Sequence, residues 1–584
     1  MVKVRAGFGF VFIFTVMVAL GSCANSDTGA RQDDAYALLN TDITPAMTLS
    51  GNYLAGRYAQ RRQDWSAAEH FMSAVVSIDT DNNSLLQRTF LLAIGAGEHD
   101  NARRHAKNIL SANGESELAM IYLACDAMAR GAYQETIDYM QSLPGEGFGD
   151  YTKPLLTAWA QMGLGQYEAA EKTLAASAGP DDPTYRIHAG LMAELSQDKQ
   201  KAAEHYAVAM ETGLTMHSAL LVANFLQRIG EIETAEKVYA GLGRFYPFNP
   251  FEGMARRVDE AANTPNITTA ADGAAYALFD IASLLYERRA FDSAQIYGQL
   301  VQMLMPQSPY VLMMLGDIAA LNENYPQAIA YYHKIPQTAA LHWLSQMRVA
   351  EVYQSNGHND RAINLLTDLS QQPQTRIQAL ITLGDIHRRA ENFAQAVEVY
   401  DQALTGIDVL TEDHWPIIYA RGMSLERANN WDRAEKDLLM ALEFQPDNPM
   451  ILNYIGYSWA DKGVHLDKAL DYIHRAVTLR PDDGYILDSY GWALYKTGDF
   501  EGAIEWLEKA VALVPGDATI LDHLGDAYWQ VGRRSEAQFQ WKRAMMNTKD
   551  AAFKTSIDEK LTKGINIQVP TTLPEKQRSK EAKL

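Results

Sequence analysis

The chain has 584 residues, of which 47% are hydrophobic and 10% aromatic, so it holds enough apolar material for a buried core and global disorder is excluded. It carries 51 Lys and Arg against 72 Asp and Glu, a formal charge of −21, which disfavours nucleic acid as a partner because polyanions would be repelled. Residues 1–22 and 550–584 each carry +2, so residues 23–549 hold −25 and the acidity belongs to the body of the chain.

Residues 1–22 predict a secretory signal peptide. Lys3 and Arg5 form a short basic segment, and residues 8–20 are an apolar run of thirteen residues. At about 1.5 Å per helical residue, this run is too short to cross roughly 30 Å of hydrocarbon. An uncleaved transmembrane anchor is therefore the weaker interpretation.

Residues 20–23 read Leu-Gly-Ser-Cys and resemble a bacterial lipobox. The resemblance implies that Cys23 is acylated and becomes the first residue of the mature protein, and ordinary cleavage without a lipid is the alternative. Position 24 is Ala rather than Asp, which by the same resemblance favours the periplasmic side of the outer membrane over retention at the inner membrane. Residues 23–50 are polar and rich in small side chains, which predicts a flexible tether.

The body of the chain repeats one motif with a period near 34 residues. Four glycines of the C-terminal third are 34, 35 and 34 residues apart, four alanines keep nearly the same step, and three prolines close the units: Gly422, Gly456, Gly491 and Gly525; Ala434, Ala469, Ala503 and Ala537; Pro446, Pro481 and Pro515. Small, aromatic, small and proline positions at this period resemble the tetratricopeptide repeat family over nearly the whole mature length. The resemblance implies an all-α fold, a right-handed superhelical solenoid of about 13 to 14 helix-turn-helix pairs.

Residues 485–510 show why these residue types recur. Apolar residues are spaced as on a helix in both halves, and Gly498-Asp499 interrupts them, so two antiparallel helices are expected. Weaker copies run back to the start of the body, each with an aromatic residue followed three residues later by Ala: Trp65/Ala68, Tyr167/Ala170, Phe291/Ala294, Tyr325/Ala328, Phe393/Ala396 and Trp431/Ala434. Tyr133 followed by Thr136 marks a degenerate copy.

Two polar segments suggest boundaries. We interpret residues 256–273, which have a weak helical pattern, as a joint between an N-terminal lobe over 51–255 and a C-terminal lobe over 274–549. Residues 550–584 are expected to form a partly disordered C-terminal extension. Just before the joint, residues 244–251 hold four aromatics and form either an exposed partner-binding patch or, more usually, a cap on the preceding helix pair.

The sequence offers no motif for catalysis. None of the fourteen histidines precedes Glu, and the segment Gly456-Tyr-Ser-Trp-Ala460 lacks the last glycine of a nucleophile elbow. The only two cysteines, Cys23 and Cys125, exclude a disulfide scaffold and a Cys-rich metal site, and Cys125 is expected to be a buried small hydrophobe. We therefore expect a protein that is not an enzyme and uses no cofactor, metal or small-molecule substrate.

In the tetratricopeptide family the first helix of each pair lines the concave face. Carried over to this chain, the concave positions are Asn453, Tyr457 and Ala460; Asp488, Trp492 and Tyr495; and Asp522, Asp526 and Trp529. This aromatic and acidic strip is our candidate partner-binding site, because Tyr and Trp offer large contact area and the carboxylates would select a basic or amide-rich segment. The alternative is that Trp492 and Trp529 only pack between adjacent repeats.

Several C-terminal segments, among them 487–492 and 522–529, look like a signature of large bacterial tetratricopeptide lipoproteins. Among these, the resemblance in plan is to outer-membrane lipoproteins that act as adaptors of a periplasmic carboxyl-terminal processing protease and bring it cell-wall hydrolases. It implies a non-catalytic scaffold, anchored through its N-terminal lipid, with a periplasmic serine protease as a partner. The alternative is an assembly factor for an outer-membrane, exopolysaccharide or secretin complex; an enzyme or glycan-binding protein is the least favoured interpretation.

Overall fold

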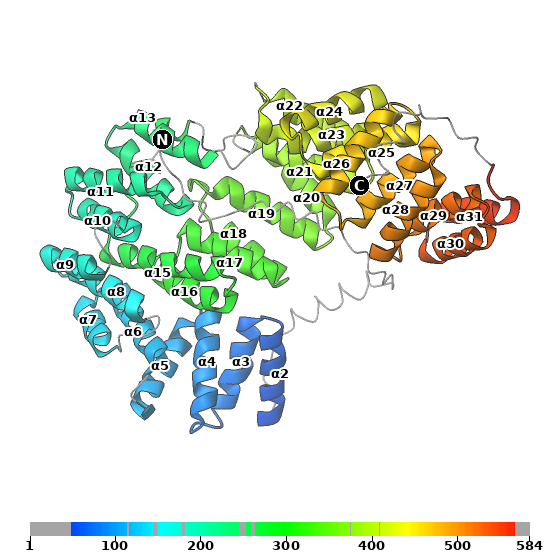
Figure 1. The fold of residues 1–584 in the computed structure, drawn as a ribbon. Coiled ribbons are helices and arrows are strands. Elements are labelled where there is room, and N and C mark those ends of the chain that lie inside the picture. The colour runs from blue at the N-terminus through cyan, green and yellow to red at the C-terminus, as the bar shows by residue number, and fades with distance from the viewer. Residues whose placement is uncertain are drawn as a thin grey trace. The chain divides into compact units, whose positions relative to one another are not determined.

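The computed structural model describes residues 48–566, apart from 114–115, 144–148, 178–181, 244–250, 252, 258–262, 374 and 408 (Figure 1). Every regular element in these residues is a helix. None of the helices described is both long and apolar enough to span a membrane. The predicted signal peptide, Cys23 and nearly all of the tether lie outside the described residues, as do residues 567–584 of the C-terminal extension.

The chain divides into two compact units, residues 1–379 and 380–584. The first contains nine helix hairpins and the short helix η1 (Met254–Arg256) among its described residues. The hairpins are α2 (Leu49–Arg61) with α3 (Trp65–Val76), α4 (Asn83–Ala96) with α5 (His99–Asn113), α6 (Glu117–Ala129) with α7 (Tyr133–Ser142), α8 (Gly149–Gly163) with α9 (Tyr167–Ser177), α10 (Pro183–Leu195) with α11 (Lys199–Thr212), α12 (Met216–Arg228) with α13 (Ile232–Gly243), α15 (Ala270–Glu287) with α16 (Phe291–Leu304), α17 (Pro309–Leu321) with α18 (Tyr325–His333), and α19 (His342–Ser355) with α20 (Asn359–Leu369).

The second unit holds the other five hairpins, and the boundary between the units falls inside α21. The helices are α21 (Arg376–Arg389) with α22 (Phe393–Thr405), η2 (Glu412–His414), α23 (Trp415–Arg427) with α24 (Trp431–Phe444), α25 (Pro449–Lys462) with α26 (Leu466–Leu479), α27 (Gly484–Thr497) with α28 (Phe500–Leu513), α29 (Ala518–Gln530) with α30 (Arg534–Asn547), and a last single helix, α31 (Ala551–Lys563). The described residues thus form fourteen helix pairs, which confirms the predicted all-α repeat architecture and its expected number of pairs.

The aromatic-to-alanine spacing in the sequence has a direct structural meaning. In each of the six pairs predicted from it, the aromatic residue is the first residue of the second helix, and the alanine three positions later is fully buried. In the degenerate copy, Thr136 replaces this alanine and is also fully buried. Its hydroxyl is satisfied there, because it donates a 3.1 Å hydrogen bond to the carbonyl oxygen of Ala124 on the preceding helix. The pattern therefore marks where the two helices of a pair cross.

The repeated glycines make these crossings close. A Cβ atom on Gly491 would lie 2.6 Å from Leu507 and 3.2 Å from the carbonyl oxygen of Ala503 on the partner helix. Gly525 faces Ala537 in the same way, at 3.2 Å. The small residues at these two positions therefore allow the backbones of the paired helices to approach each other.

The division expected at residues 256–273 does not coincide with the boundary between the two units. Thr269 and Asp272 form a capping box that starts α15 at Ala270, inside the segment interpreted as a joint. In unit 1, α15 then packs against α6, α8 and α10, and α16 packs against α4 and α6 (Figure 1). The α15–α16 hairpin therefore covers the first helices of earlier repeats instead of contacting only its neighbours in sequence.

Buried side chains hold this hairpin in place. Trp159 of α8 is fully buried, and its ring fills the space next to Gly273, where a Cβ atom would overlap it. The Trp159 indole N–H donates to Nδ1 of His188 at 3.3 Å, and Nε2 of His188 faces Asp280 of α15 at 3.3 Å. Gln295 of α16 donates a buried 2.9 Å hydrogen bond to the carbonyl oxygen of Gly95. The inner surface of these repeats in unit 1 is thus part of a packed core.

Three residues considered in the sequence analysis are buried in the structure: Cys125, Ser458 and Phe251. Cys125 is fully buried in α6, and burial raises the pKa of its thiol far above the usual value, as suits an inert small hydrophobe. Ser458 is buried within α25, not on a strand-to-helix turn. Phe251 is buried and stacks with Tyr239 of α13, which favours the cap interpretation for that residue; residues 244–250 lie outside the described residues.

Candidate protein-binding face of unit 2

The predicted strip lies on three first helices that pack directly on one another. Contacts join α25 to α27 and α27 to α29, so their equivalent positions form one row. Each helix begins at a polar residue whose side-chain oxygen accepts hydrogen bonds from the first-turn backbone: Asn448, Asp483 and Asp517. We call the surface formed by the predicted residues of α25, α27 and α29 the inner face of unit 2.

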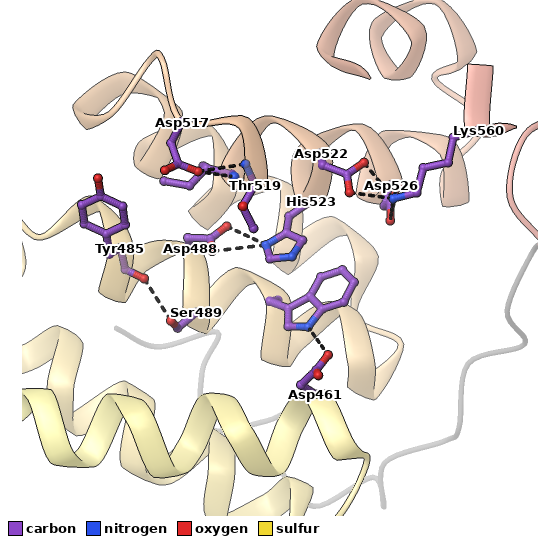
Figure 2. Close-up of polar contacts among 12 residues, drawn as sticks. Asp461, Tyr485, Asp488, Ser489, Asp517, Thr519, Asp522, His523, Asp526 and Lys560 are labelled. Atoms are coloured by element: carbon purple, nitrogen blue, oxygen red, sulfur yellow. Dashed lines mark hydrogen bonds and ion pairs between the residues drawn. The ribbon is translucent and has the colours of Figure 1, made fainter. Parts of the chain in front are cut away.

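Asp488 and His523 connect two adjacent repeats in the middle of this face (Figure 2). The carboxylate oxygens of Asp488 lie 2.9 and 3.2 Å from Nδ1 of His523, and both side chains are buried. Burial alone would lower the pKa of His523, but Asp488, aided by Asp522 and Asp526, raises it above the usual value. Asp488 therefore stabilises the protonated form of His523 inside the face.

Trp492 packs between repeats and is still partly exposed. Its ring stacks on His523 of the next repeat with centroids 4.0 Å apart, and on Tyr495 at 4.8 Å. Its indole N–H faces Asp461 of the preceding repeat at 3.5 Å. The packing role considered as an alternative is therefore real for Trp492, and its partial exposure leaves ring surface available for contact.

Asp522 and Asp526 surround one lysine of the C-terminal helix. Nζ of Lys560 lies 2.7 and 2.8 Å from the two carboxylate oxygens of Asp522, and 2.9 and 2.8 Å from those of Asp526 (Figure 2). Burial would lower the pKa of Lys560, but the two carboxylates raise it, so the ammonium form is maintained. The acidic end of the strip thus binds a basic side chain, supplied here by the same chain.

Two further donors hold the backbone that follows α31. The indole N–H of Trp529 donates to the carbonyl oxygen of Ile565 at 2.9 Å, and Nε2 of Gln530 donates to the carbonyl oxygen of Asn566 at 3.0 Å. Gly564, with φ +72°, lies against the Trp529 ring, where a Cβ atom would overlap it. Trp529 therefore contacts a chain segment as well as packing against Trp541, whose ring centroid is 5.2 Å away.

The other predicted residues occupy the same row. Tyr495 is buried, its hydroxyl accepts a 3.0 Å hydrogen bond from Gln530, and burial raises its pKa to about 12. Tyr457 and Asn453 of α25 are half-buried. The side-chain oxygen of Asn453 has no hydrogen-bond partner among the residues described.

Sequence reasoning did not identify the groups that complete this face. Neither α31 nor its Lys560 was predicted from the sequence, and His523 was not predicted because it lies outside the three carried-over positions of its repeat. A signal for α31 existed: Asp550 caps its first turn by accepting hydrogen bonds from Ala552 and Phe553, and Gly564 follows its last residue. The pattern is weak because Ile557 is the only buried residue of the helix.

The charges around Lys560 predict a pH-dependent stability. Burial, reinforced by Asp522, raises the pKa of Asp526 to about 6, although Lys560 and His523 act in the opposite direction. Because the unfolded chain releases this proton at lower pH than the folded protein, stability falls as the pH rises from about 4 to about 6. As long as α31 stays in place, removing the Lys560 charge raises the pKa of Asp526 further, so the loss continues to higher pH. We expect the destabilisation caused by Lys560→Met to grow by about 1 kcal/mol between pH 5 and pH 7.5.

Urea unfolding of the full chain at the two pH values measures this difference. The matched control is Lys554→Met, since Lys554 lies exposed on the same helix. A Lys560→Met variant whose deficit is the same at both pH values would contradict the proposed charge balance.

No group of three or more His, Cys, Asp or Glu side chains in the described part of the chain is arranged to hold a metal ion. The face instead presents stacked aromatic rings, paired carboxylates and indole and amide donors that reach main-chain carbonyls. This chemistry suits binding of a polypeptide segment.

The class of protein follows from the repeats. Family profiles described as "Tetratricopeptide repeat" match residues 155–212, 279–340, 419–483 and 379–413, and one described as "TPR repeat" matches residues 491–532. The chain therefore contains tetratricopeptide repeats in both units, and repeats of this kind typically form non-catalytic scaffolds that bind other proteins.

Among individual proteins, the chain is similar to the TPR repeat-containing protein PA4667 of Pseudomonas aeruginosa. The two are 31% identical over 186 residues, which is 32% of this chain and 30% of the relative. The match thus spans less than a third of the relative's length.

Among solved structures, Cut9–Hcn1 of the APC/C matches 91% of this chain and 98% of its own, at 13% identity and a TM-score of 0.36. MamA AMB-1 matches 31% of this chain and 97% of its own, at 22% identity and a TM-score of 0.25.

Proposed function

We propose that this protein is a lipid-anchored adaptor on the periplasmic side of the outer membrane, which docks a periplasmic processing protease and brings it cell-wall hydrolases. The observation that carries the adaptor role is the inner face of unit 2, where a basic, backbone-exposing segment is bound between Asp522, Asp526, Trp529 and Gln530. The N-terminal segment ending in Cys23 supports the anchored location.

The acidic body agrees with this function. Three carboxylates of the inner face, those of Asp488, Asp522 and Asp526, bind basic groups, and the neighbouring Asp461 faces the indole N–H of Trp492. Such a surface favours partners that present lysine or amide groups and disfavours acidic ones. A partner protease or hydrolase would be expected to present that chemistry at its contact segment.

Affinity purification of the tagged full-length protein from crosslinked cell envelopes tests the proposal. We expect a processing protease and cell-wall hydrolases to co-purify, and we expect Cys23→Ala to move the protein from the membrane fraction to the soluble fraction. Secretin, exporter or barrel-insertion components in place of the protease would contradict the adaptor role and favour an assembly factor. A Cys23→Ala variant that stays membrane-bound would contradict the lipid anchor.

A further inference from the structure

In each unit a helix of the chain itself packs over a repeat surface, α15 in unit 1 and α31 in unit 2. The two helices differ in how much of their surface is buried. In unit 1, eleven residues of α15 are buried, among them Gly273 against the fully buried Trp159. In unit 2, α31 buries only Ile557. Removing α15 would expose a packed core, whereas removing α31 would expose mainly the polar groups that bind Lys560 and residues 565–566.

The bound Lys560 shows which side chain this surface accepts. Four carboxylate oxygens lie within 2.7 to 2.9 Å of a single nitrogen atom. This arrangement suits the compact ammonium group, whereas the planar guanidinium of arginine spreads its donors over a fork and cannot bring four oxygens close to one nitrogen atom. The surface therefore favours lysine over arginine by shape, since the two side chains carry the same charge.

The contacts after α31 add a second requirement. Trp529 and Gln530 bind main-chain carbonyl oxygens, which every sequence offers, so these hydrogen bonds fix only the path of the backbone. Gly564 is different, because its φ of +72° and its position against the Trp529 ring leave no room for a side chain. Lys560 and Gly564 together define a helix end of the form Lys-x-x-x-Gly.

The contacts that bind α31 are of a kind that a partner segment could replace. A helix of 13 residues is marginal in isolation, and α31 gains little from apolar burial, so its docking depends on the lysine and on the two backbone contacts. A partner segment with the same groups can form the same bonds. With α31 in place, the side chains of Asp522 and Asp526 are 11% and 8% exposed, and both carboxylates lose their bound cation when α31 leaves.

We propose that the inner face of α29 is a binding site for a partner helix that ends in Lys-x-x-x-Gly, and that residues 551–566 occupy this site until such a partner displaces them. This inference deepens the protein-binding function proposed above by specifying the partner's recognition segment. It does not depend on the partner being a protease.

The test uses the full chain and a fluorescein-labelled peptide of residues 549–566 as the probe. In the variant Lys560→Glu the chain's own segment is repelled by Asp522 and Asp526, so the peptide is expected to bind at least tenfold more tightly than to the wild type, where the tethered segment competes. The milder variant Lys560→Gln should give the same direction. Adding Asp522→Asn and Asp526→Asn to Lys560→Glu should abolish peptide binding.

Peptide variants test the recognition rule. Replacing the lysine at 560 by arginine, or the glycine at 564 by valine, should weaken binding at least tenfold, whereas replacing Lys554 by glutamine should not change it. Equal binding of all four peptides would overturn the Lys-x-x-x-Gly rule.

Hydrogen exchange separates a displaceable segment from a fixed structural helix. In Lys560→Glu, residues 551–566 should lose protection while α29 and α30 keep theirs. Loss of protection throughout α29 and α30, or unchanged protection of 551–566 together with no peptide binding, would overturn the proposal. Because no protease is present in these assays, their failure is distinguishable from failure of the adaptor function.

Discussion

Replacing Trp541 by alanine is expected to lower the free energy of unfolding of unit 2 by about 4 kcal/mol. The side chain is fully buried in α30, fills the space beside Gly525, and packs against Trp529. Its indole N–H also donates a buried 2.9 Å hydrogen bond to Asp526, so the substitution removes a donor from a buried carboxylate in addition to leaving a cavity.

Urea unfolding of the full chain, with hydrogen exchange to assign the loss to α29 and α30, measures this effect. Phe539→Ala is the matched control, because Phe539 lies on the same helix and is 59% exposed, so its loss is expected to stay below about 0.5 kcal/mol. Equal losses in the two variants would show that Trp541 does not hold the last repeat together.

Gly273→Ala is expected to destabilise unit 1 by about 2 kcal/mol, although alanine favours helices more than glycine does by about 1 kcal/mol. The added Cβ atom would overlap the ring of Trp159, which is fully buried and cannot move without disturbing its contacts to α15. Hydrogen exchange should show faster opening of α8 and α15.

Gly516→Ala provides the comparison, since a Cβ atom there would meet only the Asn547 side chain at an ordinary 3.7 Å. We expect the free energy of unfolding of that variant to change by less than about 0.5 kcal/mol. If Gly273→Ala lowered the free energy of unfolding no more than Gly516→Ala, the close packing of the α15–α16 hairpin on the earlier repeats would be contradicted.

The helix pairs could be predicted from the sequence because their determinants are local and periodic. Trp431 and Ala434, or Phe393 and Ala396, mark the start and crossing point of a second helix whatever the rest of the chain does. The candidate positions Asp488, Trp492 and Tyr495 on α27 came instead from the resemblance to tetratricopeptide repeats, in which equivalent positions of stacked repeats share one face.

The segments that pack over the repeat surfaces, the α15–α16 hairpin and α31, could not be predicted in this way. The contact between Gln295 and Gly95 joins residues 200 positions apart, and no repeat rule specifies it. Lys560 lies outside the repeats, and its role depends on where Asp522 and Asp526 point in three dimensions. Both cases are tertiary contacts between a repeat surface and a segment that lacks the repeat pattern.

These contacts change how the acidic strip is understood. Asp522, Asp526 and Trp529 bind the chain's own C-terminal segment, while Tyr457 and Trp492 remain partly exposed on the neighbouring helices. A partner that displaces residues 551–566 would therefore contact α29 as well as α25 and α27. While residues 551–566 are bound, only the residues on α25 and α27 are open to a partner. Charge pairing at Lys560 would then regulate access to that surface.

Site-specific photo-crosslinking in intact cells tests most directly whether the inner face of unit 2 binds the partner. A photoreactive phenylalanine derivative replaces Tyr457, which is half-buried on α25, or Glu501, which is exposed on the second helix α28. Partner binding at the inner face predicts a covalent adduct with the processing protease or its substrate from position 457, strengthened by Lys560→Glu, and none from position 501. Adducts from position 501 and none from position 457 would contradict it.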